Sequence, residues 1–499
     1  MMIHKSRKKG LTMANNKKET KTLFNSSENS NFILNMTEEQ YSKLASIGLT
    51  ATCFLVFVFT AIAEIISAVS GSSSYSITAA GLSIAGVFCM ILALIALIKH
   101  YIGKNVLVPV CALAVFLAWS VISLLNSYDK SVSLYGFSQR GEGVLSTLFY
   151  LGFFITAASV KREKALRSLL DGITAAGLLN AVWGILQIFV PKLGHYKFLS
   201  LSIRANAASG LSQSPVFLAV TLTFSMTAAL IGAVCCQNKK RRIFFLVTAA
   251  LCSFTMMFTY SFIGICGLIL TIIAALISVI MTKAPKIRLL SVLAVIIPAM
   301  LPVLLVNCGT IGNLSSYKLY DGRIVWWADS YMRISAGSDV NTDTINLDSG
   351  LDVYLYMNDK TVKLMKNSPL TGTGPEQLAY PQITTFNGLS PESDISDVIV
   401  TNKNIFDKCY NEYLYIAATR GIPSLIALIA AVVSILFIGF KKLRQQRSGV
   451  ALAIFLITLS GALMFLISCS SIAFAPIFWA AAGASCASCT DTPKNSKTE

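Results

Sequence analysis

Apolar runs recur along the chain, and each has the roughly 20 residues that a helix needs to cross a ~30 Å hydrocarbon core. The pattern predicts an all-α membrane protein with about twelve transmembrane helices and one large polar loop. The predicted spans lie near residues 45–69, 78–98, 105–126, 144–160, 169–190, 211–235, 243–260, 262–281, 288–307, 412–439, 449–469 and 471–487.

Polar stretches divide the chain into five parts. Residues 1–43 are rich in Asn, Ser and Lys, which predicts a disordered tail. Nine predicted helices occupy 44–307, a polar loop occupies 308–411, three helices occupy 412–487, and 488–499 form a second polar tail. Thr37 and Gln40 have the spacing of a capping box, which predicts a helix start just before the first apolar run.

The composition agrees with this reading. Of the 499 residues, 54% are hydrophobic and 13% are charged, whereas soluble domains have roughly 25% charged residues. Most of the twelve cysteines lie within apolar runs, where they act as small apolar side chains. Cys308 and Cys409 bracket the large loop, and the sequence leaves a disulfide between them open.

Lys and Arg are concentrated in every second loop. The positive-inside rule therefore predicts cytoplasmic termini, an extracytoplasmic 308–411 loop, and a multi-pass protein of the plasma membrane. Anionic lipid at the inner surface accounts for the net charge of +17, so the basic excess implies no nucleic-acid partner. The basic loops contain Lys99 and Lys104; Lys161, Arg162, Lys164 and Arg167; Lys239, Lys240, Arg241 and Arg242; Lys283, Lys286 and Arg288; and Lys441, Lys442, Arg444 and Arg447.

Ionisable residues are almost absent from the predicted spans. Glu64, near the outer end of the first span, is either a functional group or a side chain that reaches water at the interface. Ion-coupled transporters usually need charged residues near the membrane midplane. The sequence shows no such set, which argues against a transporter.

Two shorter outer loops carry basic residues of interest. Arg140 lies beside Glu142 before the fourth span, where it is either half of an interfacial ion pair or a ligand for an anionic head group. Residues 191–210 contain Lys192, His195, Lys197 and Arg204 and no acid, which suggests an anionic ligand. A lone loop histidine such as His195 is otherwise simply solvated.

The large loop contains most of the remaining reactive groups. Residues 321–334 have helical periodicity, which predicts an amphipathic helix on the membrane surface. Arg323 lies in its first turn, where free amides and the helix dipole favour phosphate, although a snorkelling arginine is the simpler alternative. Gly372 and Gly374 predict a tight turn after a helix, and their amides could hold an anion.

The end of the loop places polar side chains at the water–lipid boundary. Tyr410, Asn411 and Glu412 are consecutive and lead into the tenth span. Arg420 follows two to three turns later, inside the predicted membrane helix. A charged residue at that depth is expected to face the bundle interior or a polar cavity.

Taken together, five pieces of the sequence resemble the O-antigen ligase and polymerase family of membrane glycosyltransferases. They are Gln139-Arg-Gly-Glu-Gly143, Ala208-Ser-Gly-Leu-Ser-Gln-Ser-Pro-Val216, Gly322-Arg-Ile-Val-Trp326, Ser368-Pro-Leu-Thr-Gly-Thr-Gly-Pro375, and Tyr410-Asn-Glu-Tyr-Leu414 followed by Arg420-Gly-Ile-Pro423. The similarity runs from about residue 105 to residue 440, and the order of the pieces agrees with the family.

The resemblance implies a GT-C-like helical fold and an activity. Such enzymes move a glycan from an undecaprenyl pyrophosphate carrier to an acceptor glycan or glycolipid in surface polysaccharide assembly, without a cofactor or an obligatory metal. Arg323 matches the family's loop arginine, and Arg140 and Arg204 are further candidates for holding the pyrophosphate. Tyr410, Asn411 and Glu412 would orient or deprotonate the acceptor hydroxyl.

The chain also departs from the family's pattern. The family's histidine falls on Tyr410, and a phenol with a pKa of ~10 is a poor base at neutral pH. Glu412, Asp407 or His195 could take its place. Phe262 stands where the family often has an arginine after a serine. A lipid-linked oligosaccharide or polysaccharide transporter and an inactive glycan-lipid-binding relative remain the alternative functions.

Overall fold

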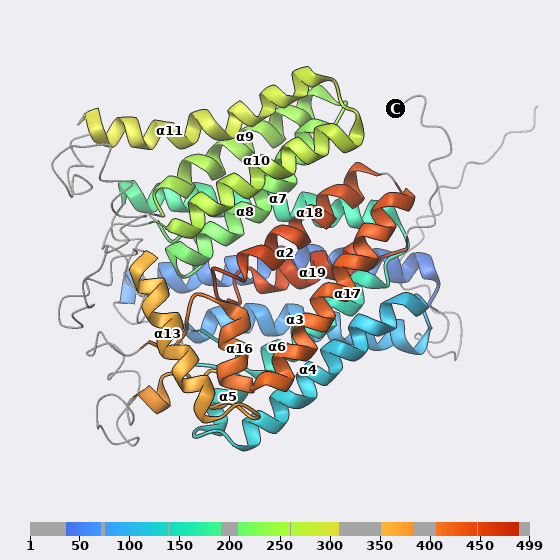
Figure 1. The fold of residues 1–499 in the computed structure, drawn as a ribbon. Helices are drawn as coiled ribbons and strands as arrows, with labels where there is room; N and C mark the ends of the chain where they lie inside the picture. The colour runs from blue at the N-terminus through green and yellow to red at the C-terminus, as the bar shows by residue number, and fades with distance from the viewer. Residues whose placement is uncertain are drawn as a thin grey trace, which may run out of the picture.

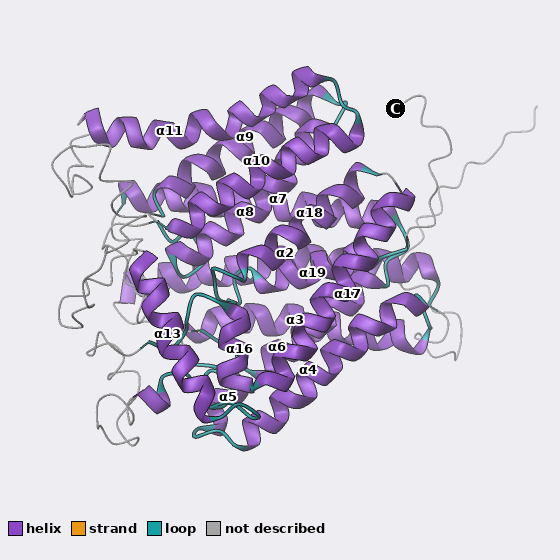
Figure 2. Ribbon diagram, in the orientation of Figure 1, coloured by secondary structure: helices purple, strands orange, loops and turns teal. Residues whose placement is uncertain are grey.

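The computed structural model describes residues 36–70, 75–137, 140–190, 208–259, 261–308, 351–382, 406–446 and 448–488. Within these ranges the chain forms helices and no strand (Figure 2). The helices are α2 (Glu38–Ser70), α3 (Tyr75–Ile98), α4 (Leu107–Leu125), α5 (Lys130–Tyr135), α6 (Val144–Ala158), α7 (Glu163–Phe189), α8 (Pro215–Cys235), α9 (Lys239–Met257), α10 (Phe262–Thr282), α11 (Leu293–Cys308), α13 (Leu351–Asn367), α16 (Glu412–Arg420), α17 (Ile422–Gln446), α18 (Gly449–Met464) and α19 (Ala475–Cys486). Short 3-10 helices precede α4 (Lys104–Val106) and α11 (Lys286–Val292).

The prediction of an all-helical membrane protein is confirmed. Among the described residues, seven helices are long and apolar enough to cross a membrane, and the helices at 144–158, 449–464 and 475–486 are apolar but shorter. The predicted total of twelve spans stays a prediction. The capping box is also present, because Thr37 N donates to Gln40 Oε1 at 2.9 Å and Gln40 N to Thr37 Oγ1 at 3.3 Å.

The predicted span at 412–439 is not one continuous helix. It divides at Gly421 into α16 and α17. Gly421 has φ of +87°, and a Cβ built there would lie 1.9 Å from the backbone oxygen of Leu370. The helix breaks because the 368–371 turn packs against this position, and Ile422 N donates instead to Pro369 O at 2.8 Å.

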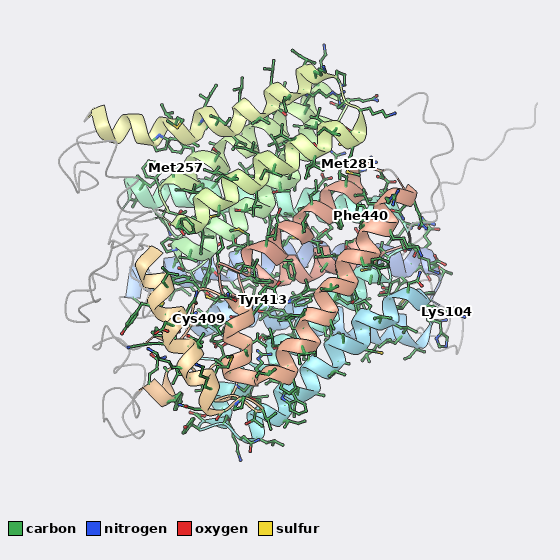
Figure 3. The ribbon with its side chains drawn as sticks, in the orientation of Figure 1. Lys104, Met257, Met281, Cys409, Tyr413 and Phe440 are labelled. Carbon is green, nitrogen blue, oxygen red and sulfur yellow. The ribbon has the colours of Figure 1, made fainter. Side chains whose placement is uncertain are left out.

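The basic loops gather at one end of the bundle. Figure 3 shows Lys104, Met281 and Phe440 at this end and Cys409 at the opposite end. The positive-inside rule assigns one side of a membrane to such loops. The contacts that join them are Glu38–Lys161 (3.3 Å), Glu39–Arg162 (3.4 Å), Asp171–Arg241 (2.5 Å), Glu163–Ser448 (3.2 Å), Arg288 with the carbonyl of Val234, and Lys442 with Ser488.

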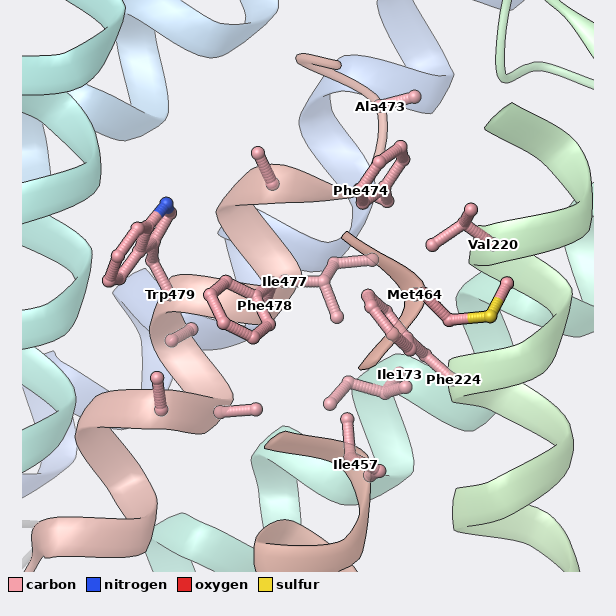
Figure 4. Close-up of a cluster of buried hydrophobic side chains, with 14 of the residues drawn as sticks. Ile173, Val220, Phe224, Ile457, Met464, Ala473, Phe474, Ile477, Phe478 and Trp479 are labelled. Carbon is pink, nitrogen blue, oxygen red and sulfur yellow. The ribbon is translucent and has the colours of Figure 1, made fainter. Parts of the chain in front are cut away.

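Helix α8 lies in the middle of the bundle. In its most hydrophobic stretch, 94% of the residues are buried, whereas in the other candidate spans half of the residues or fewer are buried. Figure 1 shows α9, α10 and α11 on one side of α8 and α2 and α19 on the other. Phe224 of α8 packs against Phe474 with ring centroids 6.1 Å apart (Figure 4). This aromatic contact fixes α8 against the chain segment that leads into α19.

Helix α13 crosses the end of the bundle opposite the basic loops (Figure 1). Met357 and Leu364, seven residues apart on one face, are each 1% exposed. The tight turn that Gly372 and Gly374 predicted, and the helix before it, are confirmed. Cys409, at this end, has a free buried thiol.

Candidate active site

Two loops that are far apart in sequence meet through a pair of buried salt bridges. Arg140, from the loop before α6, lies 2.5 Å from Asp407 (Nη2 to Oδ2), and the two side chains are 3% and 4% exposed. Glu142, two residues later, pairs with Lys408. The sequence left two readings of Arg140 open, an interfacial ion pair with Glu142 or a ligand for an anionic head group. The structure corrects the first of these, because each charge instead pairs across to the loop before α16.

Lys408 is the centre of the charged cluster. Its Nζ binds Glu142 and lies 3.4 Å from Glu376 Oε1, and it donates to the backbone oxygen of Ser470 at 3.1 Å. Tyr415 OH donates to Glu376 Oε1 at 2.8 Å. All these side chains are less than a tenth exposed. Four loops, and helix α16 through Tyr415, are therefore tied together at one buried ammonium group.

Ser470 links two of the acidic side chains. Its backbone N–H donates to Glu412 Oε2 at 2.7 Å, and its hydroxyl donates to Glu142 Oε1 at 2.6 Å. Tyr150 OH also donates to Glu142 Oε1 at 3.1 Å. Among the described residues, Glu412 Oε1 accepts no hydrogen bond. It is the oxygen that is available to a ligand.

The carboxyl groups of the cluster titrate differently because their surroundings differ. Burial raises the pKa of Glu412, which precedes the spanning helix α17, to about 7, although the Lys408 charge opposes this shift. Burial also raises the pKa of Glu376. At Glu142 burial acts in the same direction, but the adjacent ammonium and the hydrogen bonds overcome it, so its pKa is lowered. Glu142 therefore stays ionised at neutral pH, whereas Glu412 can gain or lose a proton near neutral pH.

A cavity opens beside the cluster. The empty space between its walls amounts to about 700 Å³, including the part open to solvent. Its charged end is formed by Glu142, Glu376, Lys408, Glu412 and Arg420, and its apolar wall comes from α4, α6, α17 and α19. The apolar residues include Leu113, Phe116, Leu151, Leu428, Val432 and Trp479. The cavity therefore has one polar end and one hydrophobic wall.

Arg420 faces the bundle interior, as the sequence predicted. Its Nη1 donates to Ser120 Oγ and Thr147 Oγ1, each at 3.0 Å, and its guanidinium lies 5.1 Å from the ring centroid of Phe116. Its Nε has no partner in the part of the chain that the structure describes, and the side chain is 6% exposed. A buried guanidinium that lines a cavity favours an anionic or hydroxyl-bearing ligand.

The three consecutive candidates before α17 have different positions. Asn411 is the N-cap of α16 and accepts from Leu414 N at 3.0 Å, so its side chain stabilises the helix start. Tyr410 is buried and is not part of the cavity wall, whereas Glu412 is. Of the three, only Glu412 combines access to the cavity with a pKa near neutrality.

The glycine turn holds the break between α16 and α17. Gly374 N donates to Thr419 O at 2.9 Å, and Gly372 N donates to Ser368 O at 2.9 Å. Both glycines have positive φ, and a Cβ on Gly372 would lie 2.3 Å from the Thr419 carbonyl carbon. These amides already have backbone acceptors, so their role in anion binding stays a prediction.

His195, Arg204 and Arg323, with the amphipathic helix at 321–334, lie outside the described residues. Sequence reasoning missed Lys408, Glu376 and Ser470. Lys408 was visible between Asp407 and the tyrosine that aligns with the family's histidine, and Glu376 directly follows the glycine turn. Nothing in the sequence marks Ser470, because its role depends on where the fold places its backbone N–H and its hydroxyl.

Comparison with known families agrees with this region. Residues 247–429, which include the glycine turn, the Lys408 loop and α16, match the family model described as O-antigen ligase. This part of the chain is similar to the O-antigen ligase family. The pieces at 139–143 and 208–216 lie before the matched region, and no curated protein matches the chain at a significant level. An O-antigen ligase domain in a multi-pass membrane protein indicates glycan transfer between lipid-linked substrates in polysaccharide assembly.

Proposed function

We propose that this protein transfers a glycan from an undecaprenyl pyrophosphate carrier to an acceptor sugar, during polymerisation or ligation of a surface polysaccharide. The observation that carries the proposal is Glu412. This carboxyl group lines the cavity, has an oxygen that accepts no hydrogen bond from the described residues, and has a pKa of about 7. A group with these properties can act as a base at neutral pH.

Glu412 would accept the proton of the acceptor hydroxyl. The hydroxyl oxygen forms a bond to the anomeric carbon as the bond from that carbon to the diphosphate oxygen breaks, and the diphosphate leaves with the electron pair. This attack from the opposite face inverts the anomeric configuration. Ser470 N–H holds the other oxygen of Glu412 at 2.7 Å, which keeps the basic oxygen turned toward the cavity.

Glu412 suits the role of base better than Tyr410. A phenol that loses its proton near pH 10 has almost no basic form at pH 7. Tyr410 is also not part of the cavity wall. The residue two positions after the family's histidine would therefore perform its function in this chain.

The cations nearby would stabilise the charge on the departing diphosphate. Arg420 lines the cavity, and its Nε has no partner among the described residues. Arg140 forms a salt bridge with Asp407. Arg323, Arg204 and His195 remain candidates for the same task on the basis of the sequence. The apolar wall of the cavity suits a substrate attached to a hydrocarbon chain.

The test uses Glu412→Gln, which keeps the size of the side chain and removes its basicity. In a strain that lacks the chromosomal copy, this variant should make no surface polymer and should accumulate the lipid-linked intermediate on the outer leaflet. Tyr410→Phe should retain most of the activity. Full polymer from Glu412→Gln would refute the role of Glu412, and an intermediate confined to the inner leaflet would favour a transporter.

A further inference from the structure

A tight turn carries Glu376 to the charged end of the cavity. Gln377 N donates to Gly374 O at 3.1 Å, which closes a four-residue turn with Pro375 and Glu376 at its centre. Glu376 has φ of +62°. This is the pattern of a type II turn, in which the residue after the proline is normally glycine or asparagine, because other side chains strain the backbone at positive φ. The turn therefore holds a strained glutamate where a glycine would fit without strain.

Helix α5 and the loop before it hold the turn in this conformation. Gln377 Oε1 accepts from Tyr128 N at 2.7 Å. Ser133 Oγ donates to Pro375 O at 2.8 Å. These bonds fix the backbone on both sides of Glu376. Backbone strain that the surrounding structure maintains is characteristic of functional sites, so the position of this carboxyl group calls for an explanation in terms of function.

The two carboxyl oxygens of Glu376 have different surroundings. Tyr415 OH donates to Oε1 at 2.8 Å, and Lys408 Nζ lies 3.4 Å from the same atom. Within the described ranges, Oε2 accepts no hydrogen bond. Glu376 is 2% exposed and lines the cavity. Polar atoms at such buried positions are normally paired, so Oε2 is available to a ligand that enters the cavity.

Glu376 and Glu412 are joined through a short series of contacts. Glu412 Oε2 accepts from Ser470 N at 2.7 Å, and Ser470 O accepts from Lys408 Nζ at 3.1 Å. Lys408 Nζ in turn lies 3.4 Å from Glu376 Oε1. Both carboxyl groups line the cavity, and each is held through one oxygen. The cavity therefore has two carboxyl groups at one end, each with its second oxygen available.

Aromatic side chains complete the surroundings of this end. Phe116, Tyr413 and Trp479 line the same cavity. A pyranose ring has hydroxyl groups around its edge and C–H groups on its faces. Carboxyl oxygens pair with the hydroxyl groups, and aromatic rings pack against the C–H faces. The lining residues therefore suit a sugar ring.

We propose that Glu376 is a specificity-determining residue, which binds hydroxyl groups of the acceptor sugar through Oε2 and so places the reacting hydroxyl at Glu412. A site that pairs with a hydroxyl group discriminates strongly against a sugar that lacks it, because the buried carboxyl oxygen is then left unpaired. The identity of this sugar as the acceptor rests on the proposed function, whereas the sugar contact at Glu376 does not.

The test measures the binding of the methyl glycosides of glucose, galactose, mannose and N-acetylglucosamine to the full-length protein in lipid nanodiscs, by saturation-transfer NMR. At least one of these sugars should bind the wild type. Glu376→Gln keeps an oxygen for Tyr415 and should bind that sugar at least about 10-fold more weakly. Glu376→Gly/Tyr415→Phe suits the positive φ, leaves no unpaired hydroxyl on Tyr415, and should bind it roughly 10- to 100-fold more weakly.

Monodeoxy derivatives of the same sugar identify the hydroxyl groups that Glu376 contacts. One derivative should bind the wild type about as weakly as the parent sugar binds Glu376→Gln, because removing either partner breaks the same hydrogen bond. The variant should no longer distinguish this derivative from the parent sugar. A purely structural role of Glu376 would instead lower the affinity for every derivative by the same factor.

Glu39→Gln is the matched control. Glu39 forms an exposed ion pair with Lys43 at 3.3 Å in the first turns of α2, at the end of the bundle with the basic loops. The substitution is the same in kind but lies far from the cavity. It should leave the binding of every glycoside unchanged.

Four results would overturn the proposal. They are a wild type that binds none of the four glycosides, equal affinity in the wild type and both Glu376 variants, equal losses for all deoxy derivatives, and unfolding of both variants at the assay temperature. Glu412→Gln separates this proposal from the proposed function. Full polymer from Glu412→Gln would refute the base and leave a Glu376-dependent sugar contact standing, whereas an inactive Glu412→Gln with no dependence of sugar binding on Glu376 would refute the sugar contact alone.

Discussion

Replacing Lys408 with methionine tests how much the buried ion pairs of the site contribute to the stability of the protein. Lys408 is 1% exposed, and the change keeps its approximate volume while removing the charge that faces Glu142 and Glu376. Removing one partner of a buried ion pair destabilises a protein by about 3–5 kcal/mol, because the other charge stays buried without compensation. Two carboxyl groups face this ammonium, so we expect the upper part of that range.

The assay is unfolding of the purified variants in mixed detergent micelles, followed by tryptophan fluorescence. Lys363→Met is the control, because Lys363 forms an exposed ion pair with Asp359 at 2.7 Å. Surface pairs contribute under about 1 kcal/mol, so this control should unfold almost like the wild type. The double variant Lys408→Met/Glu142→Gln should recover most of the loss, since it leaves neither member of the pair charged.

Acidification gives a second signature of the same pair. The pKa of Glu142 is lowered in the folded protein, so its contribution to stability is present above its unfolded pKa of ~4.3 and is lost as the pH falls below that value. In Lys408→Met the carboxyl group loses its counter-charge and protonates more easily. The difference from wild type should therefore shrink between pH 7 and pH 4. A loss below about 1 kcal/mol, or a double variant worse than the single one, would refute this reasoning.

Three further predictions follow from the geometry. Gly421→Ala should lower the free energy of unfolding by about 2 kcal/mol or more, because Gly421 has a φ of +87° and an added Cβ would lie 1.9 Å from Leu370 O. Gly103→Ala is the control, since the atom nearest to an added Cβ is 3.8 Å away, and it should unfold like the wild type in the same assay. Glu64 accepts from Trp183 Nε1 at 2.5 Å and from Gln187 Nε2 at 3.3 Å, so Glu64→Met leaves these donors without their acceptor and should lower the free energy of unfolding by about 1–3 kcal/mol in the same assay; an unchanged value would contradict this. Transfer measured from pH 5 to 8 should fall as the pH drops below about 7, because protonated Glu412 cannot act as a base, and a flat profile would contradict the assignment.

Much of the fold could be predicted from the sequence. The apolar runs locate the helices because a membrane helix must be hydrophobic along its whole length, and the Thr37–Gln40 spacing marks the start of the first one. The burial of Arg420 followed from the cost of exposing a charge to lipid. These features depend on local sequence and on the solvent alone.

The charge pairing could not be predicted in the same way. Arg140 and Glu142 are close in sequence, so pairing them was the natural hypothesis. Their actual partners, Asp407 and Lys408, lie more than 260 positions away, and only the docking of the two loops brings them together. The break at Gly421 has the same origin. Gly421 and Pro423 weaken the helical pattern, but the helix stops at Gly421 because a distant turn occupies the space.

The loop before α6 and the loop before α16 are joined by two adjacent salt bridges. Arg140 and Asp407 form one salt bridge and Glu142 and Lys408 the next, so two short segments are joined by adjacent pairs of opposite polarity. The first pair lies toward Phe217 and the end of α8, and the second lines the cavity with Glu412. The two pairs thus connect the end of α8 to the charged end of the cavity. The second pair fixes the charged wall beside Glu412, and the first keeps a guanidinium close to that wall, where positive charge would stabilise a departing diphosphate.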